Sequence, residues 1–136
     1  MKIDKLLLRM IDANFNRSRE GLRVCEDICR FTLGQQKEAT ELKAIRHSVT
    51  DILKTFSAKE LLAARDVAGD GGRAFDKSER NRSGWSDVYF ANLQRSKEAL
   101  RVLEEAVKLH EPSKAGRLKK LRFRLYDHEK KIHHRF

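Results

Sequence analysis

A chain of 136 residues, of which 40% are hydrophobic, is long enough to bury one core. The single proline, the seven glycines and the 37% of charged residues are typical of long amphipathic helices. No apolar run approaches the roughly 18 residues that cross a bilayer, and the N-terminus shows no secretion signal, so we expect a cytoplasmic protein without a membrane span. Cys25 and Cys29 lie one helical turn apart and are expected to be buried thiols.

The hydrophobic pattern predicts four long helices and one short helix. Asp4 can cap the first helix, and Gly34 is a good residue to end it. The sequence Ser57-Ala-Lys-Glu60 fits a capping box at the start of the short helix, and Pro112 separates the last two long helices. The predicted helices cover approximately 4–33, 37–56, 61–65, 86–110 and 113–134.

Residues 66–85 show no helical period and contain four glycines. An irregular segment of this length in a small helical domain is usually functional or disordered. Glycines allow successive backbone N–H groups to converge on a phosphate, and Asp66 and Asp70 are hard oxygen ligands suited to Mg²⁺. An ordinary series of solvated turns would account for the same residues.

An internal repeat relates the two halves of the chain. Residues 12–27 and 90–105 are identical at nine of sixteen aligned positions, and a weaker match aligns 41–54 with 117–130. The repeated unit is therefore a helical hairpin, and the predicted fold is all-α. It comprises four long helices as two repeated hairpins, a short helix and a glycine-rich loop. We expect one domain, 1–136, with the repeats at about 4–56 and 86–134 and a link at 57–85.

The repeat keeps polar residues as well as apolar ones. At 100° per residue, Arg17 and Asn14 fall within the apolar arc of the first helix, and Glu20 borders it one turn on. A guanidinium inside an apolar face must be paired or must bind an anion. Internal Arg–Glu pairs between core helices would satisfy this requirement, and so would a phosphate site. The equivalent residues of the second copy are Asn92, Arg95 and Glu98.

Two further observations concern the molecular surface. The repeated residues Arg23 and Arg101 stand three positions before Glu26 and Glu104, a spacing that favours surface ion pairs. The predicted helix at 113–134 is strongly basic, which would suit a nucleic acid or a phosphate-rich ligand. Aromatic residues make up only 7% of the chain and no recognition module is visible, so a nucleic-acid partner is not expected.

Several segments together resemble one known family. These are Ile11 to Asp27, Ala64-Arg65-Asp66 with Gly69-Asp70, Asp87 to Glu105, and Leu121 to Asp127. They are similar to the small helical, monofunctional hydroxymethylpyrimidine-phosphate kinases of bacterial thiamine synthesis. Members of that family occur alone or as the N-terminal part of fusions with thiamine-phosphate synthase. The resemblance covers essentially the whole chain. It implies transfer of the γ-phosphoryl group of ATP to the monophosphate of 4-amino-5-hydroxymethyl-2-methylpyrimidine.

In that reaction both substrates are polyanions, and a phosphate monoester is largely dianionic at neutral pH. The acceptor therefore needs no general base, and catalysis would rest on Mg²⁺ and on positioned cations. We expect Arg17 and Arg95 to bind phosphates, with Glu20 and Glu98 orienting them or contacting the aminopyrimidine. Further candidates are Asn14, Asn92, Arg65, Arg73, Arg46 and His47 for substrate or ATP, and Asp66 and Asp70 for Mg²⁺.

Other functions fit the same sequence. A non-catalytic domain could bind the pyrimidine phosphate, or dock on thiamine-phosphate synthase, without consuming ATP. A purely structural four-helix protein would leave the glycine-rich segment without a purpose. The sequence leaves open which hairpin would serve ATP and whether hairpins from two chains pair in a homodimer.

Overall fold

The computed structural model describes residues 3–74 and 81–136, and its regular elements are helices, with no strand among these residues. The expectation of an all-α fold is confirmed. The long helices are α1 (Lys5–Asp27), α2 (Gln36–Leu53), α5 (Trp85–Val107) and α6 (Pro112–Ile132). The shorter elements are the π-helical turn η1 (Ile28–Thr32), α3 (Ala58–Ala64), and the 3₁₀ turns η2 (Gly71–Arg73) and η3 (His133–Arg135).

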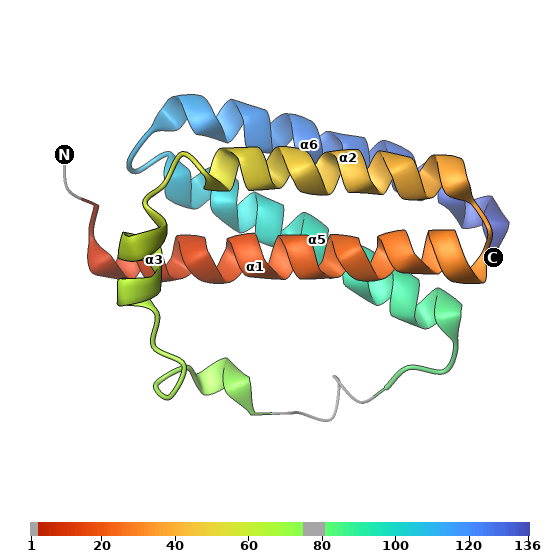
Figure 1. Ribbon diagram of the computed structural model, residues 1–136, viewed down its shortest axis with the longest axis horizontal. Coiled ribbons are helices and arrows are strands. Elements are labelled where there is room, and N and C mark those ends of the chain that lie inside the picture. Colours follow the sequence, from red (N-terminus) through yellow and green to blue (C-terminus); the bar gives the residue numbers. More distant parts are fainter. Residues whose placement is uncertain (1–2, 75–80) are drawn as a thin grey trace.

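The four long helices form two hairpins that cross each other. α1 packs against α2, α5 packs against α6, and the most extensive contact joins α1 to α5. α1 and α5 run in opposite directions, and α2 and α6 lie together on one side of them (Figure 1). α3 packs on α1, and residues 65–74 then lie on the side of α1 away from α2 and α6 (Figure 1).

Equivalent residues of the two repeats meet where α1 and α5 cross. The Ser96 hydroxyl donates a hydrogen bond to the Ser18 carbonyl oxygen at 3.0 Å, and both residues are buried. Close approach of the helices requires Gly21, because a Cβ there would lie 2.7 Å from the Asn92 carbonyl oxygen. The duplicated sequence thus folds with an approximate two-fold axis near Ser18 and Ser96.

The predicted capping signals are confirmed. The Asp4 carboxylate accepts a hydrogen bond from the Leu6 amide at 3.4 Å, and the Ser57 hydroxyl accepts one from the Glu60 amide at 3.2 Å. Because Ser57 is the cap, α3 begins at Ala58, earlier than predicted. Gly34 has a φ of 65°, the left-handed conformation expected after a helix.

The end of the first helix differs from the prediction. The sequence favoured a single helix as far as Leu33, whereas the α-helical part ends at Asp27 and a wider turn follows. The Leu33 amide donates to the Ile28 carbonyl, five residues back, at 3.0 Å, which is the π-helical spacing. Apolar periodicity could not reveal this change, because both helix types keep Ile28 and Cys29 in the core.

The hydrophobic core draws residues from all four long helices. Cys25 and Cys29 are buried free thiols, as the sequence predicted. The Cys25 thiol donates to the Tyr89 carbonyl oxygen at 3.3 Å, and the Tyr89 hydroxyl contacts the Nε2 atom of His128. Burial raises the pKa of the Cys29 thiol to about 11 and also raises the pKa of the Tyr89 hydroxyl.

The duplicated glutamates are buried, which corrects the prediction that they lie on the surface. The predicted pair is found in the second repeat, where Arg101 reaches Glu104 at 3.8 Å, but not in the first, where Arg23 pairs with Asp27. Arg46 of α2 donates to Glu26 at 3.0 Å, and Arg122 of α6 donates to Glu104 at 3.0 Å. Arg46 and Arg122 occupy equivalent positions in the repeat, so each hairpin carries the same internal ion pair. Residue spacing along one helix could not predict a partner that arrives from the next helix.

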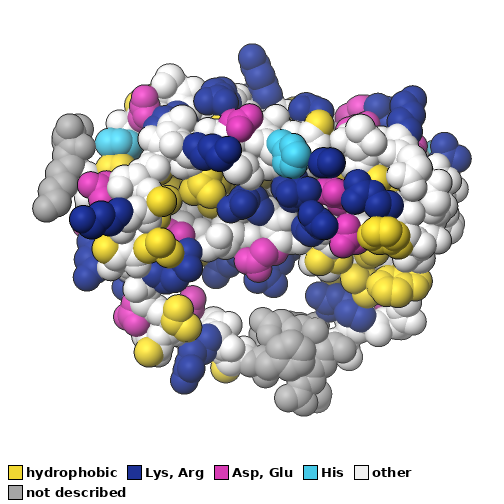
Figure 2. Space-filling model, viewed as in Figure 1, with side chains coloured by type: hydrophobic (Ala, Val, Ile, Leu, Met, Phe, Trp, Pro, Cys, Tyr) yellow, Lys and Arg dark blue, Asp and Glu magenta, His cyan; other side chains and the backbone are white. Residues whose placement is uncertain are grey.

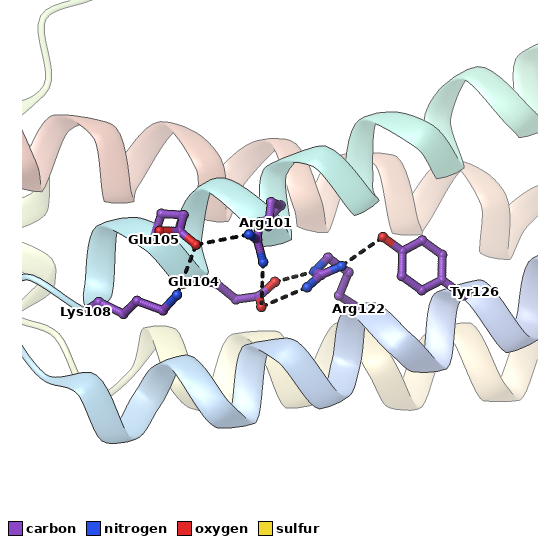
Figure 3. Close-up of polar contacts among 6 residues, drawn as sticks. All are labelled: Arg101, Glu104, Glu105, Lys108, Arg122 and Tyr126. Atoms are coloured by element: carbon purple, nitrogen blue, oxygen red, sulfur yellow. Dashed lines mark hydrogen bonds and ion pairs between the residues drawn. The ribbon is translucent and has the colours of Figure 1, made fainter.

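Neighbouring charges extend the second of these pairs (Figure 3). Arg122 also donates to the Tyr126 hydroxyl at 2.8 Å, and Arg101 reaches Glu105 at 3.3 Å on the surface. In the first repeat the corresponding surface pair joins Arg23 to Asp27 at 3.3 Å. Much of the repeated polar sequence therefore stabilises the hairpins.

No helix in the described part of the chain is long and apolar enough to cross a membrane.

Candidate anion-binding cleft

A cleft of about 660 Å³ lies between α1, α5 and the segment that follows α3. Figure 2 shows a hollow between the bundle and this segment, with Lys and Arg side chains on the bundle side. Five arginines contribute to the cleft lining: Arg9, Arg17, Arg65, Arg73 and Arg95. Four carboxylates also contribute: Asp12, Glu20, Asp66 and Asp70.

Arg17 and Arg95 come from equivalent positions of the two repeats and line the same cleft. Both are exposed, which corrects the prediction that they lie within the apolar face. α2 and α6 cover only one side of α1 and α5, so residues at the border of the apolar arc point out of the opposite side. Among the described residues, neither guanidinium has a hydrogen bond or an ion pair.

Arg65 is held by Asp12 through two parallel hydrogen bonds. The Nε and Nη2 atoms of Arg65 each donate to a carboxylate oxygen of Asp12 at 2.7 Å. These bonds and the charge of Asp12 raise the pKa of Arg65. Arg65 follows the last residue of α3, so the pair fixes the start of the glycine-rich segment against α1.

Sequence reasoning did not select Asp12 or Arg9 as site residues. Asp12 aligns with Phe90, so its acidic side chain is absent from the second repeat. That break in the repeat is a usable signal, because a residue needed only for packing would tend to keep its type. Arg9 reaches Asp66 at 3.9 Å and gave no comparable signal.

The glycine-rich segment is organised by its two aspartates. The Gly69 amide donates to Asp66 at 2.8 Å, and the Gly72 amide donates to Asp70 at 2.8 Å. Each aspartate therefore supports a turn, as the solvated-turn explanation predicted, and each also lines the cleft. No group of three or more potential metal-ligating side chains occurs among the described residues.

The other predicted residues divide between the cleft and the rest of the molecule. Asn14, Glu20 and Arg73 line the cleft, whereas Asn92 and Glu98 do not. The amides of Asn14 and Asn92 donate to carbonyl oxygens one turn back in their own helices, at 2.9 and 2.8 Å.

Glu98 accepts a hydrogen bond from Gln94 at 2.8 Å. In the described chain, no ion pair joins Arg17 to Glu20 or Arg95 to Glu98. Two candidates on α2 are also absent from the cleft lining: Arg46, which pairs with Glu26, and His47, which is exposed.

These features define an all-α protein with an internal duplication and an arginine-lined cleft beside α1 and α5. The sequence model of the ThiD2 family matches residues 9–131, and the chain belongs to the ThiD2 family.

Curated relatives include thiamine-phosphate synthases from three organisms. The protein from Nostoc sp. is 41% identical over 129 residues, which are 94% of this chain and 36% of the relative. The protein from Gloeobacter violaceus is 40% identical, over 90% of this chain and 35% of the relative. The protein from Rhodopirellula baltica is 34% identical, over 90% of this chain and 33% of the relative. The chain thus spans about a third of the length of these relatives. No solved structure gives a significant match.

Proposed function

We propose that the chain acts in thiamine biosynthesis as an ATP-dependent phosphotransferase that converts 4-amino-5-hydroxymethyl-2-methylpyrimidine phosphate to the diphosphate. The observation that carries the proposal is the convergence of Arg17 and Arg95, without protein partners among the described residues, on a cleft that also holds the glycine-rich segment. The relatives named thiamine-phosphate synthase support the pathway. The reaction belongs in the cytoplasm, where ATP is available.

The cleft is suited to direct transfer between two phosphates. Its described lining includes no His, Cys, Ser or Lys side chain, so carboxylates are the only common bases or nucleophiles there. A dianionic acceptor oxygen needs no base, but its repulsion from ATP must be overcome. Arg17 and Arg95 can offset that charge because neither is paired with a carboxylate of the described chain.

The remaining charged residues would position the phosphates and the metal. Arg73 is the last residue of η2 and lines the cleft next to Gly72, and it would contact the nucleotide phosphates. Asp66 and Asp70 would hold Mg²⁺, which supplies charge neutralisation between phosphoryl oxygens when bound. Asp12 would keep Arg65 and the segment after it in place over the cleft.

The direct test is incubation of the protein with ATP, Mg²⁺ and the pyrimidine monophosphate, followed by product mass measurement. We expect the mass gain of one phosphoryl group, and we expect Arg17→Ala and Arg95→Ala to lower kcat/KM by orders of magnitude. Arg23→Ala is the matched control, because Arg23 lies on the same helix and pairs with Asp27 outside the cleft. Normal rates in both cleft variants would show that these arginines have no part in the reaction.

A second candidate function follows from the length comparison. Because the chain spans only about a third of its curated relatives, it also fits a domain that binds the pyrimidine phosphate for a thiamine-phosphate synthase without chemistry of its own. This function predicts binding of the monophosphate with no consumption of ATP. The same incubation separates the two, because only the phosphotransferase forms ADP and a heavier pyrimidine product.

A further inference from the structure

Two arginines of the cleft are related by a symmetry that its proposed substrates lack. Ser18 and Ser96 meet at the crossing of α1 and α5. Each follows directly after an arginine of the cleft: Arg17 precedes Ser18, and Arg95 precedes Ser96. The two guanidiniums are therefore related by the same approximate two-fold axis that relates the helices. A ligand that engages both in the same way must present two equivalent anionic groups.

The charges around this pair distinguish it from Arg9 and Arg65, whereas Arg73, on the glycine-rich segment, is also without an ion pair among the described residues. Arg65 is engaged by Asp12 in a bidentate pair, and Arg9 lies 3.9 Å from Asp66. Arg17 and Arg95 have no such partner in the part of the chain that the structure describes. Binding of an anion to Arg17 and Arg95 would break no ion pair within residues 3–74 and 81–136, so these two residues are favoured contacts.

We propose that Arg17 and Arg95 form a two-fold clamp for a diphosphate group, and that the cleft binds inorganic pyrophosphate as a ligand in its own right. The two phosphates of pyrophosphate are equivalent about the bridging oxygen, so each guanidinium can take one phosphate. Arginine binds such groups through two parallel N–H bonds, which makes the contact directional as well as electrostatic. This inference uses the same cleft as the proposed phosphotransferase and adds to it the class of group that the clamp selects.

The clamp also predicts discrimination between anions. Inorganic monophosphate carries less charge and offers one phosphate to two guanidiniums, so we expect it to bind more weakly than pyrophosphate. Each arginine would contact one of two equivalent phosphates, so the loss of either arginine should weaken pyrophosphate binding to a similar extent. A site built around only one arginine would give unequal losses.

The test is isothermal titration calorimetry of the full chain with inorganic pyrophosphate and, separately, with inorganic monophosphate, both in buffer containing Mg²⁺. We expect one pyrophosphate per chain and weaker binding of monophosphate. Arg17→Ala and Arg95→Ala should each weaken pyrophosphate binding at least about tenfold, the loss expected for one hydrogen-bonded charge contact. Arg23→Ala should bind as the unchanged protein does.

Circular dichroism and melting temperature check that each variant is folded, and Arg17→Lys and Arg95→Lys serve as second variants if an alanine variant is not. The lysine variants keep the charge and lose the paired geometry, so they should bind pyrophosphate more weakly than the unchanged protein. Absence of pyrophosphate binding, equal affinity for monophosphate, or loss in only one of the two arginine variants would overturn the clamp. Because the titration contains no ATP and no pyrimidine, its outcome is independent of whether phosphoryl transfer is observed.

Discussion

The hydroxyl of Ser96 donates a hydrogen bond to the carbonyl oxygen of Ser18, and the two residues occupy the same position in the two copies of the repeat. This contact lies at the crossing of α1 and α5, where the helix backbones come close together. Small residues on both helices allow that approach, and the approach brings the residues next to them to a common surface. The geometry of the cleft therefore depends on the packing at this crossing.

Gly21→Ala should destabilise the protein. The added Cβ would lie 2.7 Å from the Asn92 carbonyl oxygen, which is backbone and cannot turn away. Overpacking of this kind costs about 1–3 kcal/mol, more than the roughly 1 kcal/mol that alanine gains over glycine in a helix. Urea denaturation measures the difference, and Gly116→Ala is the control because a Cβ there meets nothing within 4 Å. Equal stability changes in the two variants would contradict the close approach.

Glu104→Gln should also destabilise the fold. It removes the charge that balances Arg122, whose side chain is only 10% exposed. Loss of one partner of a buried pair costs about 3–5 kcal/mol, and Glu26→Gln in the first hairpin should behave alike. The surface variant Asp127→Asn breaks only an exposed pair with Lys131 and should leave the free energy of unfolding nearly unchanged. A small effect of Glu104→Gln in the same denaturation series would show that the internal pair is dispensable.

Stability should fall in alkaline solution as the buried thiols and the tyrosine are forced to ionise. Burial raises the pKa of Cys29 from its ordinary value of 9.0 to about 11. Between these values the unfolded chain has lost a proton that the folded chain keeps, so stability declines as pH rises, by about 1.4 kcal/mol per pH unit for one such group. We expect the free energy of unfolding, measured by denaturation between pH 9 and about pH 11, to decline less steeply with pH for Cys29→Ala. The same slope in both proteins would show that Cys29 does not contribute.

Asp66→Asn and Asp70→Asn should raise the Mg²⁺ concentration needed for half-maximal product formation. An asparagine side chain can still accept the hydrogen bonds from the Gly69 and Gly72 amides, so the turns survive while the negative charges are lost. Asp51→Asn is the control, because Asp51 is exposed on α2 and lies outside the cleft lining. A Mg²⁺ requirement that does not move in either cleft variant would place the metal elsewhere.

The unphosphorylated pyrimidine alcohol should be a poor acceptor. An alcohol needs a base to remove its proton, and the described cleft lining offers only carboxylates for this role, with no histidine or lysine. The alcohol also lacks the phosphate charge that would dock on the cleft arginines. We expect its kcat/KM to be lower than that of the monophosphate by at least about a hundredfold, the contribution that a general base commonly makes. Parallel initial-rate measurements with the two acceptors decide this, and comparable rates would refute a mechanism based on charge alone.

The fold was largely predictable because the chain repeats itself. The matching peptides at 12–27 and 90–105 identified two hairpins, and local signals at Asp4, Gly34 and Ser57 located helix ends. The internal ion pairs were not predictable, because Glu26 and Arg46 are brought together only by the packing of consecutive helices. The same limit applies to the π-helical turn, which preserves the apolar pattern of an ordinary helix.

The candidate site was predictable only in part. Polar residues kept in both repeats indicated Arg17 and Arg95, and the glycine-rich segment indicated Arg65, Arg73, Asp66 and Asp70; the structure brings all six to one cleft. A helical projection gives the angle of a side chain but not which sides of the helix are covered. For this reason it placed the two repeated arginines in the core instead of on the open side of α1 and α5.

The antiparallel arrangement of the two halves also constrains the chain that joins them. α2 ends at one end of the bundle and α5 begins at the other (Figure 1). The connection must therefore travel the length of a 23-residue helix, about 35 Å at 1.5 Å per residue. At about 3.3 Å per extended residue, at least about ten residues are needed to span this distance. If a deletion shortened the connection below that length, the two hairpins of one molecule could no longer pack on each other. Each half would have to pair with its counterpart from a second chain, and the product would be a domain-exchanged dimer.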